Sequence, residues 1–297
     1  MFLHLLGLDT NGHSNKPNSE EFNRNLKIVD KGVEEIVQLC ERFWRHDGRT
    51  SYIFTSDHGM TDWGSHGAGM DHETQTPILA WGAGLRQPHD GNSTWPSFSS
   101  KRSSDINQTD VAPLMASLIG SNFPQHSVGK LPLDYLNMHV IHKIEAKLGN
   151  ALQIHEQYLS FKSQRMDTIF PNMIPRHDPF RLDLISHLDR LKILISKTKY
   201  EEALKLVHEL YEQSYKGLFH YQRYHRLPLY IANSFSYIGF ICYTILTIAM
   251  DYTNIFIVGP VRKKYHSILL GGGLMFSTFA TIGQNVPLHF FLYYACP

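Results

Sequence analysis

Two apolar stretches of the sequence each end in an aspartate with a histidine close behind it. Residues 1–8 lead to Asp9 and His13, and residues 52–54 lead to Asp57 and His58, with His66 following shortly afterwards. Carboxylate and imidazole groups without thiolates suit zinc or a similar divalent cation. One such pair alone is more often a turn cap beside an ordinary polar histidine. Three such groups close to expected strand ends indicate a metal site.

Phosphoryl transfer is a reaction that such a site supports. Two metal ions about 4 Å apart can hold the attacking and the leaving oxygen of a phosphate ester. The candidate ligands number five, or six with His72 as a substitute, which is about one short of two complete sites. No serine or threonine stands out as a nucleophile upstream of Asp9. Ser56, Asp57 and His58 do not form a catalytic triad, because neighbouring side chains of an extended chain point apart.

The elements that must position these residues alternate between strand and helix. We expect a buried strand over residues 2–8, an amphipathic helix from about 17 to 43 with a capping box at its start, and a strand over 51–55. This succession predicts a βαβ unit and a parallel sheet, whose carboxyl edge would carry both Asp/His pairs. A third strand is predicted over 77–81, and a short helix from about 109 to 118.

The second half of the chain changes character at two places. Residues 134–226 have the pattern of amphipathic helices, and nothing there suggests chemistry. Residues 227–250 carry no charge and predict a membrane span, with a second one over about 268–294. The basic residues 262–264 between them mark the cytoplasmic side, which places residues 1–226 in a lumen. Two N-glycosylation sequons, at Asn92 and Asn107, agree with that orientation.

Composition excludes some classes of function. The formal net charge of +1 gives no basic surface for nucleic acid. Three cysteines far apart in the sequence offer neither a disulfide framework nor a Cys-x-x-Cys metal site. The N-terminus lacks the basic run and the cleavage motif of a signal peptide.

The motifs resemble those of a known group of enzymes. Residues 5–13, 55–60 and 64–67 resemble the metal-binding motifs of the alkaline phosphatase superfamily, and residues 108–114 resemble a helix that follows them in that fold. The whole chain is similar to the ethanolamine phosphate transferases of glycosylphosphatidylinositol (GPI) anchor synthesis. The resemblance implies one zinc ion held by Asp9, His13 and His66 and another held by Asp57 and His58, with manganese also compatible.

The resemblance further implies a reaction. The family transfers phosphoethanolamine from phosphatidylethanolamine to a mannose of the GPI precursor, here the first mannose, through a threonine nucleophile in the endoplasmic reticulum lumen. The chain departs from the family because that threonine, another metal aspartate, the N-terminal anchor and most membrane spans are absent. We therefore expect a chain truncated at both ends and inactive alone. The alternatives are a non-catalytic isoform and a metal-dependent phosphodiesterase of the same superfamily.

The expected fold class is α/β, and three domains are predicted. Residues 1–133 would form an incomplete alkaline-phosphatase-like parallel sheet with flanking helices, in the lumen. Residues 134–226 would form a helical connecting region, and residues 227–297 a multi-pass membrane region with about two transmembrane helices. Phosphatidylethanolamine, the GPI precursor lipid and the membrane are the expected partners.

Overall fold

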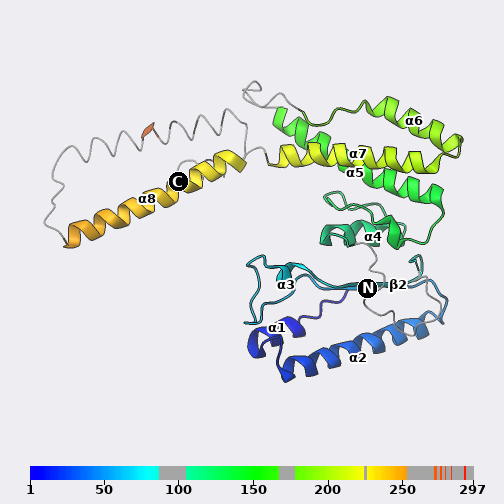
Figure 1. Cartoon of the computed structure of the whole chain (residues 1–297), viewed down its shortest axis with the longest axis horizontal. Helices are drawn as coiled ribbons and strands as arrows, with labels where there is room; N and C mark the ends of the chain where they lie inside the picture. The colour runs from blue at the N-terminus through cyan, green and yellow to red at the C-terminus, as the bar shows by residue number, and fades with distance from the viewer. Residues whose placement is uncertain are drawn as a thin grey trace. The chain divides into compact units, whose positions relative to one another are not determined.

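The computed structural model describes residues 1–86, 105–166, 178–223 and 226–252, with a few isolated residues after 270 (Figure 1). The chain divides into two compact units, Met1–Ala146 and Lys147–Pro297. The predicted domain boundaries at 133/134 and 226/227 stay predictions.

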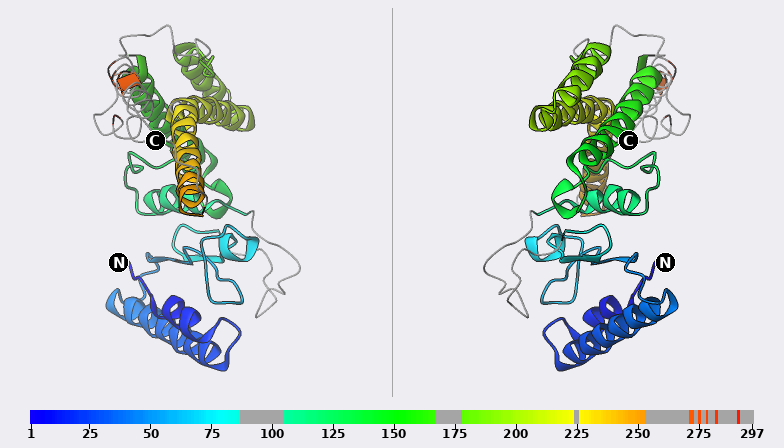
Figure 2. Two further views of the ribbon diagram at one scale, coloured as in Figure 1. Left: turned by 90° about the vertical axis from the view of Figure 1, so that its left-hand side faces the viewer. Right: turned by 90° about the vertical axis from the view of Figure 1, so that its right-hand side faces the viewer.

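The first unit begins with two helices, α1 (Gly7–Asn15) and α2 (Glu20–Phe43), that lie side by side (Figures 1 and 2). The strand predicted over residues 2–8 is wrong, because the helix begins at Gly7 and no strand in the described part of the chain pairs with this segment. The carbonyl groups of residues 6 and 7 accept hydrogen bonds from helix α1 and from α2 instead of from a neighbouring strand. The Leu6 carbonyl accepts from the Thr10 N–H at 3.2 Å, and the Gly7 carbonyl accepts from Asn25 Nδ2 at 3.0 Å.

Helix α2 forms where the sequence predicts it. Its N-cap is Ser19 and not Asn18, with which the expected capping box would begin. The Ser19 hydroxyl accepts the Phe22 N–H at 3.1 Å, as serine does at many helix starts. The helix is connected to the next strand by a hydrogen bond of 2.8 Å from the Tyr52 hydroxyl to Glu41 Oε1. None of the residues of α2 is buried in the described structure, so its apolar stripe is only partly covered.

The sheet consists, in the described residues, of two strands, β1 (Ser51–Thr55) and β2 (Ile78–Gly82). They pair antiparallel, with Ser51 opposite Gly82 and Thr55 opposite Ile78. The predicted βαβ unit and parallel sheet are therefore wrong, because β1 pairs antiparallel with β2 and the described residues before α2 form a helix instead of a strand. The expected α/β class is corrected to a mostly helical fold with one small antiparallel sheet.

Helix α4 (Val111–Leu118) supplies part of the hydrophobic core that Ile53 of the sheet packs against. It confirms the short helix predicted there. The 3₁₀ helix η1 (Gln108–Asp110) precedes it, and η2 (Leu133–Tyr135) follows. The buried centre of this core is Leu114, Leu131 and Leu136, with Ile53 of β1 packed against it. The short helix α3 (Asp71–Thr74) lies in the long connection between β1 and β2.

The described parts of residues 134–226 are largely helical. Helix α5 (Val140–Met166) is followed by α6 (Leu184–Ser196) and α7 (Tyr200–Gln222), and α6 and α7 lie against each other (Figure 2). Tyr158 of α5 is almost fully buried, and the ring edge of Tyr158 lies where a Cβ on Gly217 would stand. A glycine at 217 thus allows α7 to approach α5 closely.

Helix α8 (Arg226–Tyr252) occupies the region of the first predicted membrane span. Among the helices of the described residues, however, none combines the length and the apolarity that crossing a bilayer requires. Residues 227–250 therefore form a helix, as expected, but the prediction that this helix spans a membrane is wrong. The second predicted span, over about 268–294, lies mostly outside the described residues.

Candidate metal centre

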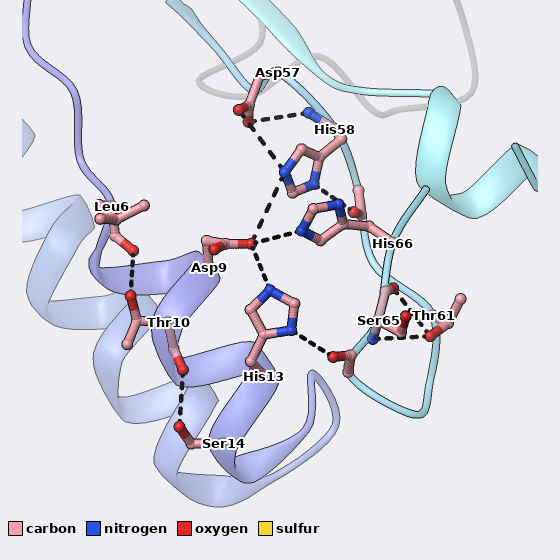
Figure 3. Close-up of polar contacts among 12 residues, drawn as sticks. Leu6, Asp9, Thr10, His13, Ser14, Asp57, His58, Thr61, Ser65 and His66 are labelled. Carbon is pink, nitrogen blue, oxygen red and sulfur yellow. Dashed lines mark hydrogen bonds and ion pairs between the residues drawn. The ribbon is translucent and has the colours of Figure 1, made fainter. Parts of the chain in front are cut away.

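The carboxylate of Asp9 is the centre of a cluster of three histidines (Figure 3). Its Oδ1 atom lies 3.5 Å from His13 Nε2, 3.6 Å from His66 Nε2 and 3.9 Å from His58 Nε2. The rings of His58 and His66 are stacked with their centroids 3.7 Å apart. One ligand atom from each of Asp9, His58 and His66 lies within 4.8 Å of the others.

Two elements supply these side chains. Asp9 and His13 are one turn apart on α1, so the helix sets them side by side on one face. His58 and His66 come from the loop that follows β1, at the place where the strand fixes the backbone. The cluster thus joins two segments about 50 residues apart in the sequence.

Hydrogen bonds to backbone carbonyls fix the orientation of two of the histidine rings. His13 Nδ1 lies 2.7 Å from the Gly64 oxygen, and His58 Nδ1 lies 2.8 Å from the Gly59 oxygen. A carbonyl oxygen only accepts, so each Nδ1 carries the proton. In the neutral ring the lone pair is then on Nε2, which faces Asp9 in both cases. Metal-binding histidines are usually held in this way.

The donor set fits a divalent cation. The Asp9 Oδ1 atom is buried and has no hydrogen-bond partner. Its distances to the three Nε2 atoms exceed the usual 2.7–3.2 Å of a hydrogen bond. Neighbouring ligands of a tetrahedral zinc ion, with bonds of about 2.0–2.1 Å, stand about 3.3–3.4 Å apart. A carboxylate oxygen faced by three imidazole nitrogens at slightly more than hydrogen-bond distance is the arrangement expected around a cation.

Asp57 takes a more peripheral position than the other predicted ligands. Its side chain is 75% exposed, and its Oδ2 lies 3.8 Å from His58 Nε2. Its Oδ1 accepts the His58 N–H at 3.0 Å. The geometry therefore brings His58 to Asp9 as well as to Asp57, whereas the resemblance divides them between two ions. That division stays a prediction. His72, the substitute ligand, is exposed on α3.

The sequence patterns did not identify the loop of residues 61–65, which supports the cluster. Gly64 has a φ of +73°, and a Cβ there would stand 2.5 Å from the Gly12 oxygen. A Cβ on Gly12 would stand 2.5 Å from Met60 Sδ. These close approaches let the loop lie against α1, so that the Gly64 carbonyl reaches His13. The glycines at 59, 64, 67 and 69 are the feature of the sequence that could have indicated such close approaches.

Gln108 is a second support, whose role its motif at residues 108–114 does not reveal. Its Nε2 atom donates to the backbone carbonyl oxygen of Asp57 at 2.6 Å and lies 3.2 Å from Thr76 Oγ1. Through it the start of the α4 segment holds the backbone that carries Asp57 and His58. Of the two predicted glycosylation sites, Asn107 is exposed just before η1, and Asn92 lies outside the described residues. Glycosylation at both stays a prediction.

Comparison with known proteins identifies the relatives of this chain. The family model for type I phosphodiesterases and nucleotide pyrophosphatases matches residues 1–73. GPI ethanolamine phosphate transferase 1 of mouse is 41% identical over 100% of this chain and 33% of its own length. The human protein of that name is 40% identical, over 100% and 32%, and that of Aspergillus oryzae is 42% identical, over 83% and 25%. The chain thus spans about a third of the length of the mouse and human relatives. No solved structure matches it.

Proposed function

Because the chain is a homologue of GPI ethanolamine phosphate transferase 1, we propose that it serves GPI-anchor synthesis as part of a metal-dependent phosphoethanolamine transferase. The donor would be phosphatidylethanolamine, and the acceptor the first mannose of the GPI precursor. The reaction would take place in the endoplasmic reticulum, with residues 1–226 on the lumenal side.

One observation carries this proposal. The buried, unpartnered Oδ1 atom of Asp9 is faced by the Nε2 atoms of three histidines. A buried carboxylate oxygen among imidazole nitrogens lowers stability unless a cation or a proton lies among them, and a divalent cation would satisfy all four groups at once. We assign Asp9, His58 and His66, with His13, to zinc, and manganese would also fit oxygen and nitrogen ligands.

A metal ion at this place would supply a Lewis acid for a phosphate oxygen. The residues of the chain have separate tasks. Asp9 provides the charge that holds the cation, and the carbonyls of Gly59 and Gly64 orient the imidazoles. Asp57 is exposed beside His58 and is open to a second cation or to a substrate that approaches from solvent.

Three hydroxyl groups near the cluster, those of Thr10, Ser56 and Thr61, are not placed as nucleophiles in the described structure. Thr10 donates to the Leu6 carbonyl, Ser56 to the His58 carbonyl and Thr61 to the Ser65 carbonyl. Each of these hydroxyl groups is therefore held by the backbone rather than aimed at the cluster. We propose that this chain binds metal and phosphate but does not complete the transfer alone, because these three hydroxyl groups are engaged with the backbone.

A phosphodiesterase is the second candidate. The match of residues 1–73 to the phosphodiesterase family favours it. A non-catalytic product that keeps only the metal site is the third. Hydrolysis of bis(p-nitrophenyl) phosphate by the zinc-loaded chain would support the second candidate. Transfer of phosphoethanolamine by this chain alone would contradict the proposed inactivity.

The test of the proposal is zinc binding by the full chain, measured by equilibrium dialysis with metal analysis. We expect at least one tightly bound zinc ion, lost in His58→Ala and weakened in His13→Ala. Asp57→Ala should retain most of the binding at the Asp9 cluster, because Asp57 is largely exposed. His142→Ala is the matched control, since His142 is an exposed histidine paired with Glu145 on α5. A folded wild-type chain without bound metal would contradict the proposal.

A further inference from the structure

We propose that Thr61 is a positioning residue of the metal centre, whose hydroxyl closes the loop of residues 61–65 and so fixes His13 and His66 around Asp9. This inference rests on the proposed metal site. Thr61 itself would not touch the ion.

The Thr61 side chain makes two hydrogen bonds across the loop. Its Oγ1 donates to the backbone carbonyl oxygen of Ser65 at 3.0 Å and accepts the Ser65 backbone N–H at 3.1 Å (Figure 3). Two backbone bonds follow the same path, from the Thr61 N–H to the Ser65 oxygen at 2.9 Å and from the Gly64 N–H to the Thr61 oxygen at 2.9 Å. One hydroxyl thus fixes both the carbonyl and the amide of the residue directly before His66.

The closed loop acts on two of the histidines. His66 leaves the loop directly after Ser65, so the orientation of that peptide sets the direction of its side chain toward Asp9. The Gly64 carbonyl, held inside the loop, accepts the Nδ1–H of His13 at 2.7 Å. A change in the shape of the loop would move both rings, one directly and one through its hydrogen bond.

The loop is also tied to the end of α1. Lys16 Nζ donates to the Trp63 oxygen at 2.5 Å, and Asn18 Nδ2 donates to Asp62 Oδ1 at 3.0 Å. These bonds fix where the loop lies but not its internal shape, which depends on the bonds between Thr61 and Ser65. The side chains at 62, 63 and 65 are exposed, so the loop contributes little to the core. Loss of the Thr61 hydroxyl should therefore affect the metal site more than the fold.

The experiment compares three variants of the full chain. Thr61→Val removes the hydroxyl and keeps the side-chain shape, and Thr61→Ser restores the hydroxyl. Thr74→Val is the matched control, because Thr74 donates its hydroxyl to the Met70 oxygen on α3. Zinc affinity is measured by competition with a chromophoric chelator, the ligand geometry by the visible absorption of bound cobalt, and the thermal midpoint in EDTA.

We expect Thr61→Val to bind zinc about 10- to 100-fold more weakly, the usual effect of losing a support of a metal ligand. Its cobalt spectrum should change, its thermal midpoint in EDTA should stay near that of the wild type, and Thr61→Ser should regain both affinity and spectrum. Thr74→Val should match the wild type. If the wild type binds zinc and Thr61→Val binds it equally well, the inference is wrong while the metal site stands. A wild-type chain without zinc affinity would contradict both.

Discussion

At the scale of single residues, Asp9 has the most unusual surroundings. Its Oδ1 atom is buried without a hydrogen bond, while three imidazole nitrogens stand at 3.5–3.9 Å. An acceptor that faces other acceptors is unfavourable until a cation or a proton lies among them. The cluster is therefore expected to bind metal at the expense of the stability of the metal-free chain.

Asp9→Asn separates these two effects. An amide at this position can donate N–H groups to the facing Nε2 atoms, so at pH 8, where an ordinary imidazole is neutral, the metal-free variant should be more stable by about 1 kcal/mol. Its zinc affinity should fall by more than about 100-fold, since the only carboxylate at the centre of the cluster loses its charge. Urea unfolding in EDTA and zinc competition measure the two quantities.

Asp30→Asn is the control for that prediction, because Asp30 is exposed on α2. It should change neither quantity measurably. Tight zinc binding by Asp9→Asn, or a lower stability of that variant in EDTA, would show that Asp9 does not have the assigned role.

At the scale of elements, the sequence predicts strong amphipathic patterns better than weak ones. Helix α2 and strand β1 form where expected, since their apolar spacing is long or sharply bounded. Helix α1 could not be predicted in this way, because glycine, asparagine, threonine and serine are poor helix formers. Contacts outside α1, such as the bond from Asn25 to the Gly7 oxygen, stabilise it instead.

The residues that meet at Asp9 were predictable by type and spacing, but their arrangement was not, and metal binding by the five candidates stays a prediction. The strand-end argument assigned Asp9 and His13 to the wrong element. Their proximity comes from the helical i, i+4 relation. The roles of Gly59 and Gly64 depend on where their carbonyls point, which no residue type reveals.

The close contact between the 61–65 loop and α1 leads to a prediction for Gly64→Ala. Gly64 and Gly48 both have positive φ, +73° and +68°, but only Gly64 also has a backbone neighbour where a Cβ would stand. Gly48→Ala should therefore cost about 1–2 kcal/mol of stability from backbone strain alone. Gly64→Ala should cost more than about 2 kcal/mol and also abolish zinc binding. Thermal unfolding and zinc competition on both variants test this, and equal effects would contradict it.

At the scale of the whole molecule, the second unit contains a partly buried polar network of its own. Asp178 Oδ2 accepts from the Tyr158 hydroxyl at 2.6 Å and from Lys162 Nζ at 2.7 Å. Burial raises the pKa of Asp178, but the bonds from Lys162, Tyr158 and the Phe180 N–H hold it below its ordinary value. Burial and the bond to Asp178 raise the pKa of Tyr158 to about 12, which is unlike a tyrosine activated for catalysis. The network is structural, and it ties residues 178–180 to α5.

This network predicts a pH dependence of unfolding. A carboxyl group whose folded pKa is lowered contributes stability above its unfolded pKa of about 4, and the contribution is lost as pH falls through the folded pKa. Asp178→Asn should therefore destabilise the chain by about 2 kcal/mol at pH 7, and the difference from the wild type should shrink below pH 4. Urea midpoints by circular dichroism at pH 7, 4 and 3 measure this. Asp189→Asn, at an exposed pair with Lys192, should show no such trend.

The bond between His13 and Gly64 joins positions 51 residues apart in the sequence. A cation that binds Asp9 together with His58 and His66 would close a loop of similar length, as a disulfide does. Closing a loop of about 50 residues removes about 4 kcal/mol of chain entropy from the unfolded state in the usual model. Removing the metal with a chelator would then destabilise this chain, as reducing a disulfide destabilises a disulfide-linked protein. The supply of metal would then decide how firmly a newly made chain holds α1 in place.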